Sequence, residues 1–224
     1  MAEIKILIGC PIYDGKKYCL NKFIEGLKSL AYKNKDILLI DNSKDDLFAK
    51  QLNDLGLPTI HMGQDLKTSR DKIIYCRNLL RQEVLDGNYD YFLSLEADVV
   101  PPPDIIEKLL LHKKDIVSAV VWYYSEYEGK RIPAPLLWDF DFKGDEKYMV
   151  YVAKEELQKP QLKEIKACSL SCCLISRKAL EKVKFRYKDD SYDDVMFCID
   201  ARELGFKVYA DTTQECTHYY YKVK

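Results

Sequence analysis

One stretch decides the expected fold of the chain, and it reads YDYFLSLEADVVPPPD over residues 89–104. Its first half is aromatic and apolar and predicts a short, mostly buried strand that ends near Leu95. Glu96 and Asp98 follow, and residues two apart in an extended chain point to the same side, with small Ala97 leaving room between them. Paired carboxylates at the carboxyl end of a central strand stand where open α/β sheets bind ligands, and their oxygens suit Mg²⁺ or Mn²⁺. An acidic turn after an edge strand is the alternative interpretation.

The composition is that of an ordinary globular protein. Its 224 residues suffice for one sizeable α/β domain, and 35 basic against 36 acidic residues give no global field that would favour nucleic acid. The eight cysteines form no CxxC pair, which disfavours a zinc ribbon or a thioredoxin motif. No apolar run approaches the roughly 20 residues that cross a bilayer, and the first residues do not resemble a signal peptide. We expect a cytoplasmic protein without a transmembrane segment, for which peripheral membrane contact stays open.

The N-terminal part predicts a parallel β-α-β unit. Residues 4–10 read as a buried strand, apolar residues at helical spacing follow between Tyr18 and Leu30, and residues 37–40 read as a second strand. A crossover of this kind joins parallel strands. Neither GxGxxG nor GxxxxGK[ST] occurs in the chain, so a bound diphosphate would have to be neutralised by a metal ion or by side chains.

In this order of elements, LEADV at residues 95–99 and the prolines after it resemble the DxD motif of the GT-A glycosyltransferases, especially the large family-two type. The resemblance implies an α/β fold with a mostly parallel sheet flanked by helices. It also implies a single domain over residues 1–224, with a nucleotide-binding half at 1–100 and an acceptor-binding half at 101–224. The implied donor is a UDP- or GDP-sugar, and the implied acceptor is a carbohydrate, a lipid-linked molecule or a protein.

The same resemblance suggests residues that contact the nucleotide. Pro11, Tyr13 and Asp41 match the family positions after the first strand and at the end of the second, which hold base and ribose. Arg70 and Arg77 lie in the segment before the motif strand, where the family carries nucleotide-contacting side chains. Local structure explains some of these residues equally well, since the turn-forming residues after Asp41 are typical of an Asx turn and Arg77 fits a helix surface.

The resemblance also implies Mn²⁺ or Mg²⁺ as the cofactor. Asp98 would hold the ion together with His218, which matches the third metal ligand of many GT-A enzymes, and Glu96 would contact the ribose or a metal-bound water. A lone histidine is more often structural, so His218 keeps that alternative.

A pair of acids near the C-terminus resembles the ED segment of inverting GT-A enzymes. Asp193 and Asp194 open a predicted helix, and the resemblance implies that Asp194 is the general base, with Asp193 beside it. Ser191 and Asp194 have the spacing of a capping box, which is the structural alternative. The start of a helix also predicts a lowered pKa for Asp194.

These observations predict a glycosyltransferase that moves a sugar from a nucleoside-diphosphate sugar to an acceptor hydroxyl, with inversion and with a metal ion. A sugar-nucleotide nucleotidyltransferase on a related fold is one alternative, although the glycine-rich N-terminal loop of that class is missing. A non-catalytic nucleotide- or sugar-binding domain is the other.

Overall fold

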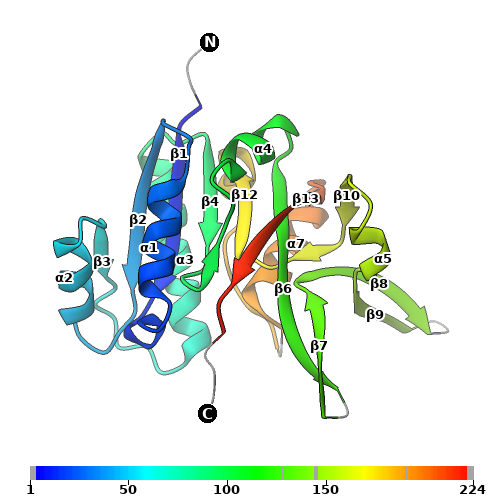
Figure 1. Cartoon of the computed structure of the whole chain (residues 1–224), viewed down its shortest axis with the longest axis horizontal. Coiled ribbons are helices and arrows are strands. Elements are labelled where there is room, and N and C mark those ends of the chain that lie inside the picture. The colour runs from blue at the N-terminus through cyan, green and yellow to red at the C-terminus, as the bar shows by residue number, and fades with distance from the viewer. Residues whose placement is uncertain (1–3, 128, 144–145, 190, 221–224) are drawn as a thin grey trace.

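A curled, mostly parallel sheet forms the centre of the molecule, with helices packed on it (Figure 1). The computed structural model describes residues 4–127, 129–143, 146–189 and 191–220. The strand order is β10-β13-β6-β12-β4-β1-β2-β3. The strands on this path are β1 (Ile6–Ile12), β2 (Lys35–Asp41), β3 (Thr59–His61), β4 (Tyr91–Leu95), β6 (Ile116–Tyr127), β10 (Leu162–Ile165), β12 (Cys172–Ser176) and β13 (Val208–His218). This architecture confirms the fold class expected from the sequence.

Helices cover both faces of this sheet, and each face has its own apolar cluster. Along β1, Ile6 and Ile8 point into one cluster and Leu7 into the other, as the alternation of an extended strand requires. The first cluster packs against α1 (Leu20–Ser29), α2 (Leu47–Asp54) and α4 (Ile105–Leu111). The second packs against α3 (Ser69–Asp86), α6 (Arg177–Lys182) and α7 (Asp193–Glu203).

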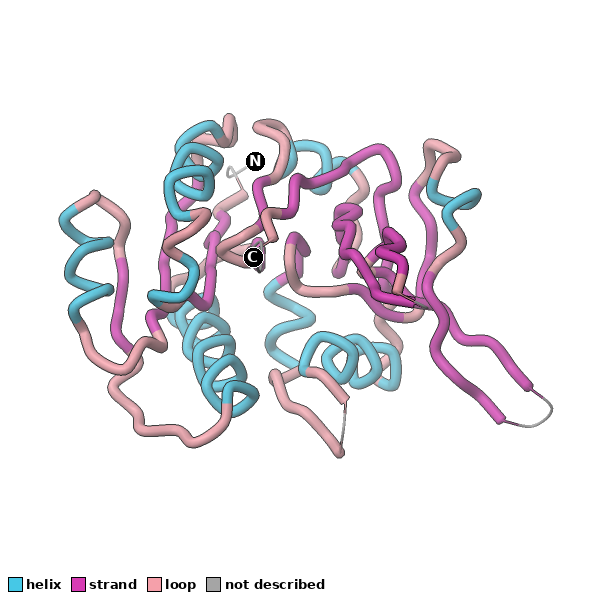
Figure 2. The backbone as a smooth tube through the Cα atoms, turned by 60° about the horizontal axis from the view of Figure 1, so that its bottom comes forward, coloured by secondary structure: helices cyan, strands magenta, loops and turns pink. Residues whose placement is uncertain are grey.

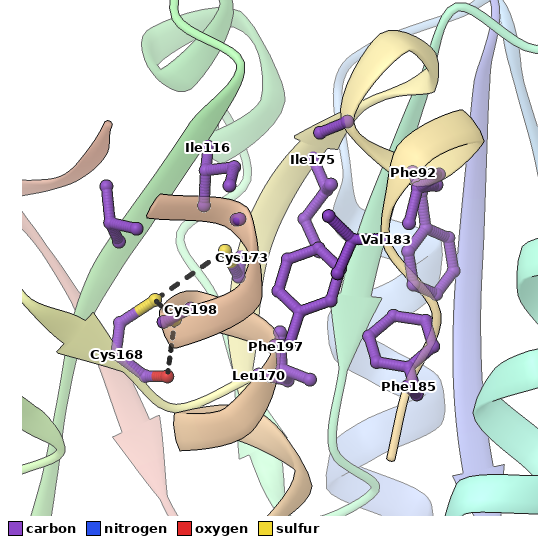
Figure 3. Close-up of a cluster of buried hydrophobic side chains, with 14 of the residues drawn as sticks. Phe92, Ile116, Cys168, Leu170, Cys173, Ile175, Val183, Phe185, Phe197 and Cys198 are labelled. Carbon is purple, nitrogen blue, oxygen red and sulfur yellow. Dashed lines mark hydrogen bonds between the residues drawn. The ribbon is translucent and has the colours of Figure 1, made fainter. Parts of the chain in front are cut away.

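The second cluster ties α7 to the middle of the sheet (Figure 3). Phe197 of α7 stacks on Phe185 with ring centroids 4.9 Å apart, and Phe92 of β4 belongs to the same cluster. The thiol of Cys168 lies 3.9 Å from those of both Cys173 and Cys198. These contacts fix where the start of α7 lies relative to the end of β4.

The N-terminal half follows the expected pattern closely. β1 is parallel to β2 and to β4, which confirms the β-α-β unit, and β2 is parallel to β3. The helix α3 begins with the Thr68 hydroxyl accepting a hydrogen bond from the Asp71 N–H, and Thr68 and Asp71 have the sequence spacing of a capping box. The helix α2 has no counterpart among the elements expected from the sequence.

The region between residues 122 and 166, for which the sequence shows no clear pattern, is rich in strands. β6 continues to Tyr127 and pairs with β7 (Lys130–Pro135). A second sheet has the order β11-β8-β9, formed by β8 (Leu137–Lys143), β9 (Glu146–Tyr151) and β11 (Ala167–Cys168). Its β8–β9 hairpin projects at the right of Figures 1 and 2. The remaining elements are β5 (Val99–Val100), the short helix α5 (Lys154–Leu157) and the 3₁₀ turn η1 (Asp14–Lys16). Along the described parts of the chain, no helix is both long and apolar enough to cross a membrane.

Gly9 of β1 is closely packed in the sheet core. A Cβ built there would lie 2.4 Å from the Phe92 ring and 2.9 Å from a Leu80 methyl. Gly9→Ala should therefore lower the free energy of unfolding by about 1–3 kcal/mol, the usual range for overpacking, in urea denaturation. In a double-mutant cycle, Phe92→Leu should cost less in the Gly9→Ala background than in the natural chain, because the smaller side chain removes the clash. Additive losses would show that Phe92 is not the limiting neighbour.

Candidate active site

The carboxyl ends of β1, β2 and β4 border a cleft of about 540 Å³, on the edge of the sheet where the sequence places the paired carboxylates. Pro11 and Tyr13 line it from the end of β1, and Glu96 and Ala97 line it from the end of β4. Ser69, Lys72, Ile73 and Arg77 line it from α3. The cleft carries both charge signs, which suits a polar, charged ligand.

Asp98 lies just past this edge, and one of its carboxylate oxygens is surrounded by cationic and hydroxyl groups. Its Oδ2 lies 2.5 Å from the Lys16 ammonium, accepts a 3.1 Å hydrogen bond from the Tyr18 hydroxyl, and is 3.6 Å from Nε2 of His218. Burial raises the pKa of Asp98, but His218 and Lys16 outweigh it and bring the pKa to about 2. Asp98 is therefore an anion at neutral pH.

The fold, rather than the local sequence, brings His218 to Asp98. After Asp98 the chain forms β5, which pairs antiparallel with the end of β13, so that His218 faces Val99. His218 Nδ1 lies 2.9 Å from the Trp122 carbonyl, which leaves Nε2 directed at Asp98. A metal-binding histidine usually has this arrangement, with the far ring N–H donated to a carbonyl or carboxylate. Burial lowers the pKa of His218, while Asp98 and the Trp122 carbonyl raise it, with a net rise.

Glu96 is turned toward α3 and β12 rather than toward this group. One of its oxygens lies 3.3 Å from the Arg77 guanidinium, and the other accepts a 2.8 Å hydrogen bond from the Ser171 hydroxyl. Arg77 is only 2% exposed, so the sequence-based alternative of a surface arginine is wrong. Its Nε lies 2.9 Å from an Asp193 oxygen, which connects the end of β4 to the start of α7.

Asp194 faces a second, smaller hollow of about 260 Å³, lined also by Asp193, Arg70 and two tyrosines. Burial and the neighbouring Asp193 carboxylate raise the pKa of Asp194 to about 7, although Arg77 and the Val195 N–H act in the opposite direction. The expectation that the helix start lowers this pKa is wrong, because desolvation and like charge outweigh the helix.

The start of α7 also differs from the expected cap. Tyr192 occupies the N-cap position and makes no side-chain cap hydrogen bond. The Ser191 hydroxyl bonds instead to the backbone of Lys188, in the turn before the helix. The predicted capping box is therefore absent from this helix start, and Asp194 is not needed there as a cap.

The other expected nucleotide contacts are distributed unevenly. Tyr13 is 44% exposed on the cleft, while Asp41 is completely buried beside it. The Asp41 carboxylate accepts hydrogen bonds from the Ser43 N–H and hydroxyl and lies 3.2 Å from His61. Ser43 lines the cleft, but Asp41 does not, so a direct contact between Asp41 and a nucleotide stays a prediction. Arg70 lies in the second hollow, over the Tyr192 ring at 5.1 Å.

The sequence does not single out Lys16 and Ser43, which line the cleft, or Ser171, whose hydroxyl bonds to Glu96. Lys16 stands in a glycine-containing turn that gives no motif, and Ser171 lies 75 residues from the glutamate that it contacts. A sequence signal exists only for Ser43, which lies two residues after Asp41, a predicted nucleotide contact.

A divalent cation fits this site with two protein ligands. Asp98 and His218 offer one oxygen and one nitrogen donor side by side, and Asp98 Oδ1 is buried without a hydrogen-bond partner. Within the described residues, no three His, Cys, Asp or Glu side chains converge on one point, and Glu96 is engaged by Arg77 and Ser171. Mg²⁺ commonly binds through one or two carboxylates plus substrate phosphates, so two protein donors are sufficient.

Comparisons with known proteins show the fold. The chain matches neither a protein family nor a curated protein. Among solved structures, A197 from STIV is 18% identical, with a TM-score of 0.53 over 97% of this chain and 87% of that one. GalNAc-T7 with UDP, GalNAc and Mn²⁺ is 11% identical, with a TM-score of 0.64 over 97% of this chain and 44% of that one. TarS 1–349 from S. aureus, in complex with UDP-GlcNAc, is 11% identical, with a TM-score of 0.58 over 98% and 60%.

The chain thus spans less than two thirds of GalNAc-T7 and TarS. At these identities the likeness establishes the architecture alone, which is that of the GT-A glycosyltransferases.

The raised pKa of Asp194 predicts a pH-dependent cost to stability. Between an unfolded value of 3.8 and a folded value of about 7, the natural protein loses stability as pH rises, because the folded state resists ionisation. Asp194→Asn removes this loss, so its advantage in free energy of unfolding should grow by at most about 1.4 kcal/mol per pH unit between pH 4 and 7. Urea denaturation at several pH values measures it. Asp65→Asn, at an exposed loop carboxylate, is the control, and an equal pH trend in both variants would contradict the assignment.

Proposed function

We propose that the protein is a glycosyltransferase that moves a sugar from a nucleoside-diphosphate sugar to an acceptor hydroxyl with inversion at the anomeric carbon. One observation carries the proposal: the cleft beside β1 and β4 and the hollow that contains Asp194 share Ser69, Ile73, Arg77 and Glu96 as lining residues. A donor whose diphosphate lies in the cleft would extend its sugar toward Asp194. The fold agrees with this use of the site.

The nucleotide end of the donor has an aromatic surface and polar loop groups to bind. The Tyr13 ring is exposed on the cleft and offers a face on which a base can stack. Asn42 and Ser43 line the same end, and Asp41 holds the Ser43 hydroxyl in place. GalNAc-T7 and TarS were crystallised with UDP or a UDP-sugar, which favours a UDP-sugar as the donor here.

The diphosphate end requires positive charge, because the departing nucleoside diphosphate takes on negative charge. Asp98 and His218 would hold Mn²⁺ or Mg²⁺ at this end of the cleft. When bound, such an ion supplies Lewis-acid stabilisation of the leaving diphosphate. Arg77 lines both hollows and holds Glu96 and Asp193, and its positive charge would attract the donor's anionic part.

Asp194 has the properties of a general base. In a single displacement, the acceptor oxygen bonds to the anomeric carbon, the bond from that carbon to the diphosphate oxygen breaks, and a carboxylate oxygen of Asp194 takes the acceptor's proton. A base works best with a pKa near the working pH, and the pKa of Asp194 is about 7. The exposed Tyr192 and Tyr187 beside it offer faces for a carbohydrate acceptor.

Donor binding is expected to stabilise the folded protein. With UDP-GlcNAc, UDP-GalNAc or GDP-mannose at a hundredfold excess over Kd, the matching donor should add about 2.7 kcal/mol to the free energy of unfolding, seen as a rise in Tm. EDTA should reduce the rise. Tyr13→Leu should abolish it, whereas Tyr148→Leu, at a similarly exposed tyrosine in β9, should leave it intact. Equal shifts in the two variants, or none with any donor, would contradict the donor site.

Asp194→Asn should lower turnover about 10²–10⁴-fold while leaving the donor's thermal shift nearly unchanged. In the natural protein, kcat should rise with pH up to about 7 and then level off, because Asp194 must lose its proton to act. The Asp194→Asn variant should not show this rise of kcat with pH. Asp200→Asn, on the same helix but ion-paired with Arg186, is the control. A product that keeps the donor's anomeric configuration would exclude this role, and donor binding without any turnover would indicate a binding module.

A further inference from the structure

Lys16 occupies an unusual position for a lysine beside a proposed cation site. It ends the turn η1, lines the cleft, and directs its ammonium at Asp98 Oδ2, 2.5 Å away. The pair is mostly buried, with 25% of the Lys16 side chain and 9% of the Asp98 side chain exposed. The two side chains thus form an ion pair that is largely shielded from solvent.

The Asp98 carboxylate is used on one side only. Lys16, Tyr18 and His218 all gather at Oδ2, whereas Oδ1 is buried without a hydrogen-bond partner. The carboxylate is thus neutralised by an internal cation at Oδ2, while Oδ1 keeps its lone pairs for a further ligand of positive charge. If Asp98 held a divalent ion, the ion and the Lys16 ammonium would share one carboxylate, and their like charges would repel each other.

A diphosphate bound in the cleft would be a second anionic partner for the Lys16 ammonium. Lys16 is joined to its turn by a flexible four-carbon stem, and it lines the cleft together with Lys72 and Arg77. A diphosphate in this cleft would bring negative charge within reach of the same stem. The ammonium can therefore exchange one anionic partner for another without a change in the backbone.

We propose that Lys16 is a diphosphate-binding residue that also competes with a divalent ion for Asp98. It neutralises Asp98 in the free protein and pairs with the diphosphate when a divalent ion binds Asp98. The proposal rests on the proposed function, since it needs a diphosphate in the cleft. The ion and the diphosphate then bind cooperatively, because each of them breaks the Lys16–Asp98 ion pair that hinders binding of the other. This coupling is reciprocal.

Calorimetric titration without any acceptor tests this proposal. The natural protein, Lys16→Met and Lys17→Met are each titrated with Mn²⁺ alone, with UDP alone in EDTA, and with UDP in Mn²⁺. Lys17 is the matched control, because it is exposed and lies over the Phe48 ring at 5.3 Å, outside the cleft. Lys16→Met should bind Mn²⁺ alone at least tenfold more tightly and UDP in EDTA at least tenfold more weakly than the natural protein, with less gain in UDP affinity from Mn²⁺. Lys17→Met should match the natural protein.

Unchanged or weaker Mn²⁺ binding by Lys16→Met would overturn the proposal, even where UDP binds well. Absence of UDP binding to the natural protein under every condition would overturn the proposed function instead. Should Lys16→Met fail to fold, Asp98→Asn gives the complementary readout. It frees the ammonium from its partner, so UDP in EDTA should bind more tightly than to the natural protein, and weaker binding would count against the exchange.

Discussion

The buried guanidinium of Arg77 is the interaction on which the arrangement of the site depends. A charge at 2% exposure requires compensation, and Arg77 obtains it from Glu96 at the end of β4 and Asp193 at the start of α7. These two elements are thereby held together across the sheet edge. Three carboxylates surround this one guanidinium, and Asp194 is the third of them. Burial and the like charge of Asp193 raise the pKa of Asp194 to about 7. The raised pKa of Asp194 thus follows from burial and from the neighbouring Asp193 carboxylate, which Arg77 offsets only in part.

A second constraint comes from the sheet topology. The chain leaves β4 at Glu96 and forms β5, which pairs with the end of the C-terminal strand β13. This pairing sets His218 beside Asp98, although 119 residues separate them in sequence. The proposed cation-binding end of the cleft is therefore built from the middle and the end of the described chain, and the proposed general base comes from α7. A site assembled in this way depends on the whole domain being folded.

Much of this arrangement is visible in the sequence where a pattern is local. The apolar runs of β1, β2 and β4 and the Thr68 cap of α3 follow from periodicity and cap chemistry, and the fold class follows from their order. The strands between residues 122 and 166 carry no clean alternation, because much of their surface is exposed, and they do not stand out from a loop. The helix α2 is only eight residues long, and it follows a turn rich in polar residues. Its buried face consists of Phe48, Ala49 and Leu52, which are too few to show a clear helical period.

The site shows the same division between local and distant information. The positions of Glu96, Asp98 and Asp194 at element ends are local properties, and the structure places them as the sequence indicates. Properties set by distant neighbours are not readable in this way. The burial of Asp41 against His61 depends on the pairing of β2 with β3, and the pKa of Asp194 depends on burial, on Asp193 and on Arg77.

One measurement tests the account most directly: a crystal structure of Asp194→Asn with Mn²⁺ and the UDP-sugar that gives the largest thermal shift. We expect the nucleotide base to lie against Tyr13 and an anomalous manganese signal at Asp98 and His218. We expect the sugar in the hollow at position 194, with its anomeric carbon accessible from that side. A donor bound elsewhere, or one in the cleft whose sugar points away from position 194, would contradict it.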